Sequence, residues 1–225
     1  MTGLGGRARI REALKQLDHN FGDGDRTIDI VGFSRGAALA LHFANQIQKR
    51  KRGSEIRFLG LWDVVPSFGI PGNNINVLWK LTLPDNVKKC YHAMALDERR
   101  RLFPLQRVQA PKGSLATVGR LQEVWFRGAH SDIGGGKNVG LTSYALSWML
   151  RRARENGLPI NEAETRRHET QCVADTPIGK PVDPKLGPQR RVSPGDAVHE
   201  SVRSRGNAGG IEHNDPPPGV VIIHG

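Results

Sequence analysis

The chain has 225 residues, enough for one sizeable α/β domain or for one domain with an irregular extension. Its formal net charge is +11, and nearly all of the excess lies in residues 1–150. This charge favours an anionic partner, either phospholipid headgroups or nucleic acid. No apolar stretch is long enough for a transmembrane helix, and the N-terminus lacks the apolar run of a signal peptide. We therefore expect a protein made in the cytoplasm.

Apolar periodicity predicts alternating helices and strands in the first 160 residues. Helical spacing marks residues 7–21, 35–48 and 143–157. Short β-rich runs mark residues 27–33, 55–65 and 121–130. Residues 74–103 are ambiguous, and short helices are expected there. Strands that alternate with helices predict a parallel α/β sheet.

The composition changes at about residue 161. From there to residue 225 the chain is rich in proline and glycine, with almost no periodic apolar face. The sequence therefore predicts an α/β domain over residues 1–160 and an irregular extension over residues 161–225. Residues 190–205 of the extension are expected to pack on the domain. Cys90 and Cys172 are far apart and outside any metal-binding spacing, which predicts free thiols.

The stretch Gly32-Phe33-Ser34-Arg35-Gly36 fits the pattern G-x-S-x-G between a predicted strand and a predicted helix. This is the context of a nucleophile elbow, a sharp turn that exposes a reactive serine above the sheet edge. The flanking glycines are expected because a Cβ at either position would collide with the neighbouring chain. The first amides of the following helix, beginning with that of Arg35, are expected to stabilise an oxyanion.

A serine nucleophile needs a base and an orienting acid. Asp63 and His130 each follow a later predicted strand, in the order serine, acid, histidine that hydrolases of this class use. Both therefore project from the sheet edge that carries Ser34. We predict that His130 is the general base and that Asp63 orients it. Asp132 remains an alternative acid, and His199 an alternative base.

Five ordered segments resemble one family: VGFSRGAA, LGLWDVV, AMALDERR, EVWFRGAHSDIGGG followed by SYALSWML, and GDAVHESVRSR. Together they resemble the catalytic domain of type VI secretion phospholipase effectors, over most of residues 25–205. The resemblance implies an α/β-hydrolase-like fold and an antibacterial lipase that degrades the membrane phospholipids of a rival cell. It also implies that Ser34 is the nucleophile, with Asp63 and His130 completing the triad.

The same resemblance implies particular partners. The substrate would be a phospholipid membrane, a type VI secretion spike or adaptor would carry the protein into the periplasm of a target cell, and an immunity protein would protect the producer. No nucleic-acid partner is predicted, because no binding motif accompanies the basic charge. No metal site and no cofactor are predicted, because acidic and histidine residues are not clustered at ligand spacing.

The sequence departs from the family before Ser34. Family members begin with a strand that carries an aspartate-glycine-threonine motif, followed by more sheet. Here only one helix and one strand fit ahead of Ser34. The first strands, and the loop that supplies a second oxyanion amide, are therefore expected to be missing. Two hypotheses stay open: a serine hydrolase of phospholipid esters, and a truncated remnant or interaction module without turnover.

Overall fold

The computed structural model describes residues 5–24, 26–50, 53–67, 79–110, 118–179, 186–204 and 211–225. The strands are β1 (Ile28–Phe33), β2 (Ile56–Trp62), β3 (Val87–Ala95), β4 (Leu121–Phe126), β5 (Ala197–His199) and β6 (Val221–Ile223). The helices are α1 (Gly6–Gly22), α2 (Arg35–Arg50), α3 (His130–Ile133), α4 (Val139–Glu155) and α5 (Glu162–Thr170), with a short 3₁₀ helix η2 (Glu200–Val202).

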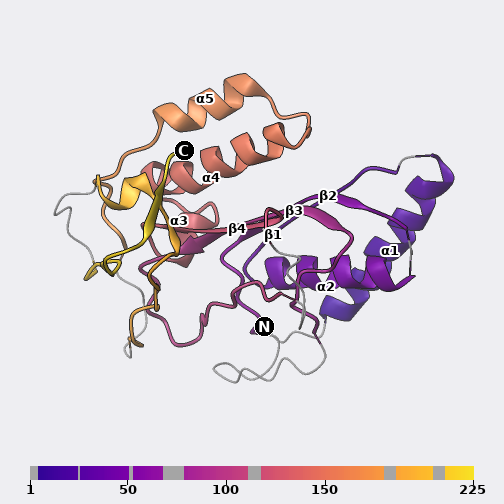
Figure 1. Ribbon diagram of the computed structural model, residues 1–225, viewed down its shortest axis with the longest axis horizontal. Coiled ribbons are helices and arrows are strands. Elements are labelled where there is room, and N and C mark those ends of the chain that lie inside the picture. Colours follow the sequence, from indigo (N-terminus) through magenta and orange to yellow (C-terminus); the bar gives the residue numbers. More distant parts are fainter. Residues whose placement is uncertain are drawn as a thin grey trace.

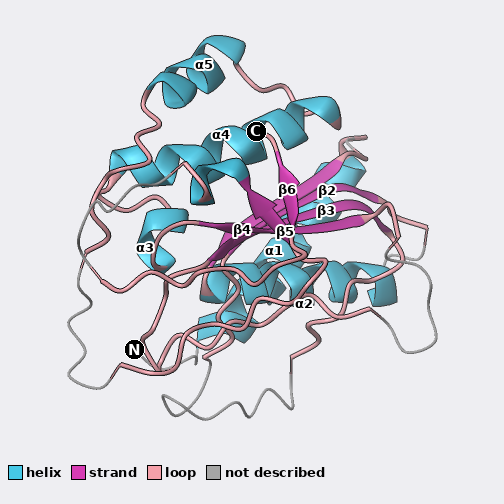
Figure 2. Ribbon diagram, turned by 60° about the vertical axis from the view of Figure 1, so that its left-hand side comes forward, coloured by secondary structure: helices cyan, strands magenta, loops and turns pink. Residues whose placement is uncertain are grey.

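The six strands form one parallel sheet in chain order, from β1 at one edge to β6 at the other. Helices cover both faces, with α1 and α2 on one side of the sheet and α4 and α5 on the other (Figures 1 and 2). This is the predicted α/β class with a parallel sheet and flanking helices. Strand β2 is almost wholly buried, as expected for a strand covered on both faces.

The two faces of the sheet have separate hydrophobic cores. Helix α2 packs its alanine-rich face on β1 and β2, where Ala37, Leu41 and Ile47 are fully buried. On the opposite face, Trp148 and Met149 of α4 are buried against the aromatic and aliphatic side chains of β2, β3 and β4. The small side chains of α2 let its axis approach the strand that precedes it, and this holds the turn at Ser34 in place.

The prediction of short helices is wrong for residues 87–95. The sequence was expected to form short helices in this region, but Val87–Ala95 is the strand β3, which pairs with β2 and β4. Two adjacent lysines, Lys88 and Lys89, interrupt the alternation that marks a strand at its start, but both neighbours are central strands that need a partner. The expectation for residues 76–78 lies outside the described residues, and residues 79–84 form no helix.

The described residues of the extension, 161–179, 186–204 and 211–225, include regular elements. They contain α5, which packs on α4, and the strands β5 and β6, which extend the sheet beyond β4. Within residues 190–204, Val198 of β5 pairs with Trp125 of β4. Strands β5 and β6 have only three residues each, too few to show a period in the sequence.

The register of the sheet brings the ends of its strands together. Phe33 pairs with Trp62, and Trp62 pairs with Ala93 of β3. Consequently Ser34 and Asp63, each the first residue after its strand, leave the sheet at the same level of its carboxyl edge.

In the described part of the chain, no helix has both the length and the apolar character needed to cross a membrane. Both cysteines are free thiols, as predicted.

Candidate active site

Ser34 lies at the sharp turn between β1 and α2. Its φ is +59°, in the left-handed region that non-glycine residues rarely adopt. The turn is fixed by backbone hydrogen bonds: the Ser34 amide donates to the carbonyl of Trp62 (2.9 Å), and the Ser34 carbonyl accepts from the amides of Ala37 (3.1 Å) and Val65 (3.3 Å). The backbone strain and these bonds are the features of a nucleophile elbow.

The turn leaves no space for a side chain at one of the two glycines of the motif, but it leaves space at the other. A Cβ on Gly32 would lie 2.6 Å from the carbonyl oxygen of Gly36 and 2.8 Å from the backbone of Ala37, so no side chain fits there. A Cβ on Gly36 would meet no described atom within 4 Å beyond its chain neighbours and the adjacent backbone of α2. The predicted steric need for a small residue therefore holds for Gly32 and is wrong for Gly36, which lies on the open side of α2.

The three predicted residues come together at the sheet edge. His130 Nε2 lies 2.9 Å from Ser34 Oγ, and His130 Nδ1 lies 2.6 Å from Asp63 Oδ2. With its proton on Nδ1, the imidazole donates to Asp63 and accepts from the serine hydroxyl. This is the geometry in which a histidine can take the serine proton while a carboxylate holds its ring and tautomer.

Asp63 is fully buried and is itself in the left-handed region, with φ +43°. Its Oδ1 accepts from the amide of Ala95 (2.9 Å) and from Arg190 Nη1 (2.5 Å), and its Oδ2 accepts from Arg190 Nη2 (3.0 Å). Burial raises the pKa of Asp63, but the charge of Arg190 and the hydrogen bonds from His130 and Arg190 outweigh burial and hold the pKa well below its ordinary value. The carboxylate therefore stays ionised beside His130.

His130 is held by groups on several sides. Its backbone amide donates to Glu98 Oε2 (3.1 Å), and Glu98 in turn accepts from the amide of Arg100 (2.6 Å). The rings of Phe33 and Phe103 lie 4.5 Å and 4.9 Å from the imidazole, centroid to centroid. These contacts restrict the imidazole to the orientation that faces Ser34.

Asp132 and His199, the alternative acid and base, lie in other environments. Asp132 Oδ2 accepts from the amide of Ala129 (2.9 Å) and Oδ1 accepts from Asn138 (2.7 Å), so its carboxylate caps the start of α3. His199 Nδ1 accepts from the Ser201 amide (3.2 Å) and caps η2. The structure therefore groups Asp63 with His130, and neither alternative contacts Ser34.

Arg35, the predicted oxyanion donor, is the first residue of α2. The first amides of a helix have no carbonyl partner within that helix and point along its axis. The start of α2 therefore directs backbone N–H groups toward the side on which Ser34 lies. This is the position from which an oxyanion formed at Ser34 can be stabilised.

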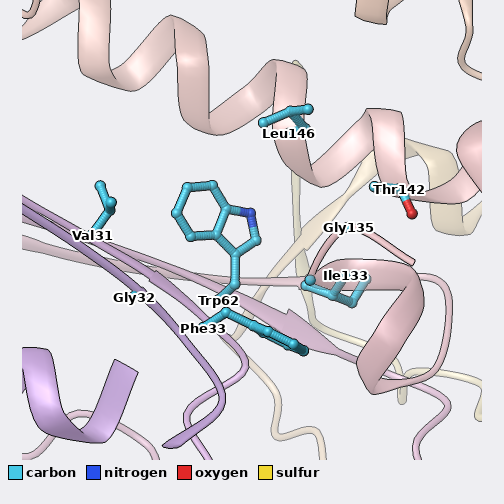
Figure 3. A pocket seen from close by; sticks show the side chains of 9 residues that line it. Val31, Gly32, Phe33, Trp62, Ile133, Gly135, Thr142 and Leu146 are labelled. Atoms are coloured by element: carbon cyan, nitrogen blue, oxygen red, sulfur yellow. The ribbon is translucent and has the colours of Figure 1, made fainter. Parts of the chain in front are cut away.

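An apolar pocket of about 260 Å³ adjoins the Ser34 turn on the α4 side of the sheet. Figure 3 shows Trp62 rising from β2 toward Leu146 of α4, with Phe33 beside it and Ile133 of α3 opposite. The ring of Phe33 packs closely on Gly134, the residue that follows α3: a Cβ at that position would lie 2.1 Å from the ring. Phe33 lines the pocket and also contacts His130. The pocket therefore adjoins the reactive residues.

Arg190 and Glu98 are site residues that sequence reasoning did not find. Arg190 lies in the proline- and glycine-rich extension, where no pattern distinguishes one arginine from the next. Glu98 lies in the segment AMALDERR, which contributed to the family resemblance without a role of its own. A buried arginine partner for Asp63 could have been expected, since a buried carboxylate needs a compensating charge.

The described residues hold no group of three or more histidine, cysteine, aspartate or glutamate side chains arranged to bind a metal ion. The acidic and histidine side chains around Ser34 are occupied with one another and with arginines. The hydrogen bonds that join Ser34, His130 and Asp63 suit the chemistry of an activated serine hydroxyl.

Comparison with known proteins identifies the family. The family described as type VI secretion system phospholipase effector Tle1-like, catalytic domain, matches residues 38–152, a range that includes Asp63 and His130 and begins four residues after Ser34. No curated protein matches the chain.

Two solved structures resemble parts of the chain. An uncharacterized protein from Pseudomonas aeruginosa is 24% identical over 75% of this chain and 30% of its own, with a TM-score of 0.48. The Tle1 effector bound to the VgrG spike of the type 6 secretion system is 35% identical over 51% of this chain and 25% of its own, with a TM-score of 0.37. The match spans less than a third of either solved chain. Since the family match takes in slightly more than half of the 225 residues, the chain belongs to the family of Tle1-like phospholipase effector catalytic domains.

Proposed function

We propose that this chain carries a serine esterase that cleaves the carboxylic esters of membrane phospholipids. The observation that carries the proposal is the position of His130, within hydrogen-bonding distance of both Ser34 Oγ (2.9 Å) and Asp63 Oδ2 (2.6 Å). The left-handed backbone of Ser34 adds to it, because such strain persists only where the surrounding structure enforces it.

The proposed reaction has two steps. His130 takes the proton of Ser34 as Oγ attacks the ester carbonyl, and the amide of Arg35 donates to the oxyanion that forms. Collapse of this intermediate breaks the bond to the alcohol, which leaves with the proton from His130, and an acyl-serine remains. Water, deprotonated by His130, then attacks the acyl carbonyl and releases the fatty acid. Asp63 stabilises the imidazolium in both steps and keeps its own charge.

The apolar pocket supports a long acyl chain as the substrate group. It is lined by side chains that neighbour the site residues in sequence: Phe33 precedes Ser34, Trp62 precedes Asp63, and Ile133 lies in the short helix that begins with His130. An acyl chain in this pocket would be removed from water next to the reacting carbonyl.

The proposal for the biological setting is based on the family. We propose that the protein acts as an antibacterial toxin, which a type VI secretion spike or adaptor delivers into the periplasm of a target cell. Its substrate would be the phospholipid membrane there, and an immunity protein would protect the producing cell. The family description, a phospholipase effector of the type VI secretion system, is the support for this proposal.

The test combines covalent labelling with lipid hydrolysis. A fluorophosphonate probe should label the wild-type protein and fail to label Ser34→Ala, and fatty acid should be released from phospholipid vesicles only by the wild type. His199→Asn is the matched control, because that histidine lies outside the Ser34 site and its loss should leave labelling intact. Folded wild-type protein that neither reacts with the probe nor releases fatty acid would refute the proposal and favour a non-catalytic member of the family.

A further inference from the structure

A second cavity, of about 510 Å³, lies between the segment after β3 and residues 187–191 of the extension. The two segments are joined by backbone contacts: the amide of Gly187 donates to the carbonyl of Arg99 (2.6 Å), and Arg100 forms an isolated bridge with Leu186. The walls of this cavity are rich in arginine. The arginines that line the cavity are Arg99, Arg100, Arg101, Arg107, Arg190 and Arg191.

Four of these arginines are paired with carboxylates. The ion pairs are Arg190–Asp63, Arg100–Glu98, Arg107–Glu123, Arg107–Asp196 and Arg99–Glu212. The remaining two, Arg101 and Arg191, are exposed and form no ion pair with any described residue. The cavity therefore has two guanidinium groups, one on each of its walls, whose charge is not compensated by the described part of the protein.

The cavity adjoins the proposed active site. Phe103, in its wall, lies 4.9 Å from the His130 ring, and the guanidinium of Arg100 stacks 3.7 Å from the centre of the Phe103 ring. Phe33, which lines the apolar pocket, lies 4.5 Å from the same imidazole. His130 therefore contacts one aromatic wall residue of an apolar pocket and one of a cationic cavity.

We propose that the arginine-lined cavity binds the phosphate group of the ester substrate, with Arg101 and Arg191 as its principal ligands. This inference rests on the esterase function proposed above and assigns a binding site to the headgroup phosphate of its phospholipid substrate. Guanidinium groups donate in a fixed fork that matches phosphate oxygens, and a pair on opposite walls can bind a tetrahedral anion from two sides. The acyl chain and the phosphate would then lie in the two cavities whose wall residues, Phe33 and Phe103, contact His130.

Binding is measured first, in a protein that cannot turn over. Ser34→Ala is titrated with dihexanoyl phosphatidylglycerol below its micellar concentration, and separately with inorganic phosphate. The same titrations are run with Arg101→Ala and Arg191→Ala added together. The control adds Arg9→Ala and Arg11→Ala instead, a pair of exposed arginines on α1 that removes the same charge.

Loss of two charge-assisted hydrogen bonds is expected to weaken binding of the lipid at least tenfold, and the α1 pair is expected to change it less than twofold. Equal weakening by both pairs would overturn the proposal, because it would mean a general effect of charge. Weaker binding of inorganic phosphate with unchanged binding of the lipid would also overturn it, because the cavity would then be a site for free phosphate.

Turnover is measured second, with the serine intact. The Arg101→Ala/Arg191→Ala protein is expected to lose about ten times more kcat/KM toward the phosphatidylglycerol than toward a neutral ester with the same acyl chain. Equal losses on the two substrates would contradict the assignment. If no ester is hydrolysed but the binding difference persists, the esterase function fails while the phosphate site stands, so the two proposals fail in different ways.

Discussion

Arg190 binds both carboxylate oxygens of Asp63, although 127 residues separate them in the chain. The same arginine donates to the carbonyls of Ala95 (2.7 Å) and Phe103 (3.0 Å). One side chain from the extension thereby ties the carboxylate beside His130 to the end of β3 and to the loop that packs on His130. The extension is therefore part of the site, and Arg190 is a positioning residue.

Arg190→Ala should destabilise the fold and shift the pH dependence of the reaction. Both side chains are buried, so the variant leaves an uncompensated carboxylate, which typically costs about 3–5 kcal/mol. Arg190 lowers the pKa of Asp63, so its loss favours protonation of that carboxylate, and the acid limb of kcat/KM should move to higher pH. Urea unfolding and a pH–rate profile measure the two effects.

Arg190→Lys separates position from charge. It keeps a cation but cannot bind both carboxylate oxygens as the planar guanidinium does. We expect an acid limb close to that of the wild type, with a lower kcat. If Arg190→Ala lowers stability and leaves the pH profile of the remaining activity unchanged, Arg190 is structural only and the positioning role is wrong.

The backbone of Ser34 gives a prediction about stability. At φ +59° a side chain costs about 1–2 kcal/mol relative to glycine, part of which the greater freedom of unfolded glycine offsets. Ser34→Gly should therefore be about 1 kcal/mol more stable than Ser34→Ala. Both variants lack the hydroxyl and both should be inactive, so the comparison isolates the backbone. Equal unfolding midpoints would show that the turn is not strained.

The two glycines of the elbow should respond in opposite ways to the same substitution. Gly32→Ala places a Cβ 2.6 Å from a backbone carbonyl and should cost about 1–3 kcal/mol, with loss of probe labelling. Gly36→Ala enters open space at the second residue of α2 and should raise stability by up to about 1 kcal/mol, because alanine favours a helix. Thermal unfolding of the pair measures this contrast, and a destabilised Gly36→Ala would contradict it.

Much of the site could be predicted because parallel strands end at a common edge. The elbow, Asp63 and His130 each follow an apolar run that is visible in the sequence, so their meeting follows from the sheet alone. Arg190 and Glu98 could not be predicted in the same way. Their positions depend on how loops cross the sheet edge, and no period in the sequence records that. Strand β3 was not predicted, because Lys88 and Lys89 interrupt the apolar alternation at its start. It forms between β2 and β4, which both pair with it.

The apolar pocket should select acyl chains by length. Leu146→Phe adds volume to the α4 wall, so fewer methylene groups of a long chain can enter. The ratio of kcat/KM for an octanoyl ester to that for a butyryl ester should fall about fourfold for each methylene excluded. Val173→Phe, which adds a larger volume at an exposed position outside the pocket, is the control and should leave the ratio unchanged. An unchanged ratio in Leu146→Phe would place the acyl chain elsewhere.

His199 makes the stability of the fold depend on pH. Burial lowers the pKa of His199 from 6.5 to about 4, although Glu200 opposes this effect, and His224 and Arg151 add to it. The unfolded chain therefore binds a proton below pH 6.5 that the folded chain excludes until about pH 4. The stability that the neutral ring contributes is complete above pH 6.5 and falls as the pH drops through this window, by about 3 kcal/mol in total.

His199→Asn tests this dependence. Asparagine keeps an acceptor for the Ser201 amide but does not titrate, so the fall in stability between pH 6.5 and pH 4.5 should be smaller in the variant. His42, whose pKa burial also lowers, remains in both proteins, and the difference between them therefore belongs to His199. Buried carboxylates with lowered pKa values, such as Asp63 and Glu98, lose their contribution mainly below this window. Parallel curves of unfolding free energy against pH for the two proteins would show that His199 is not held neutral by the fold.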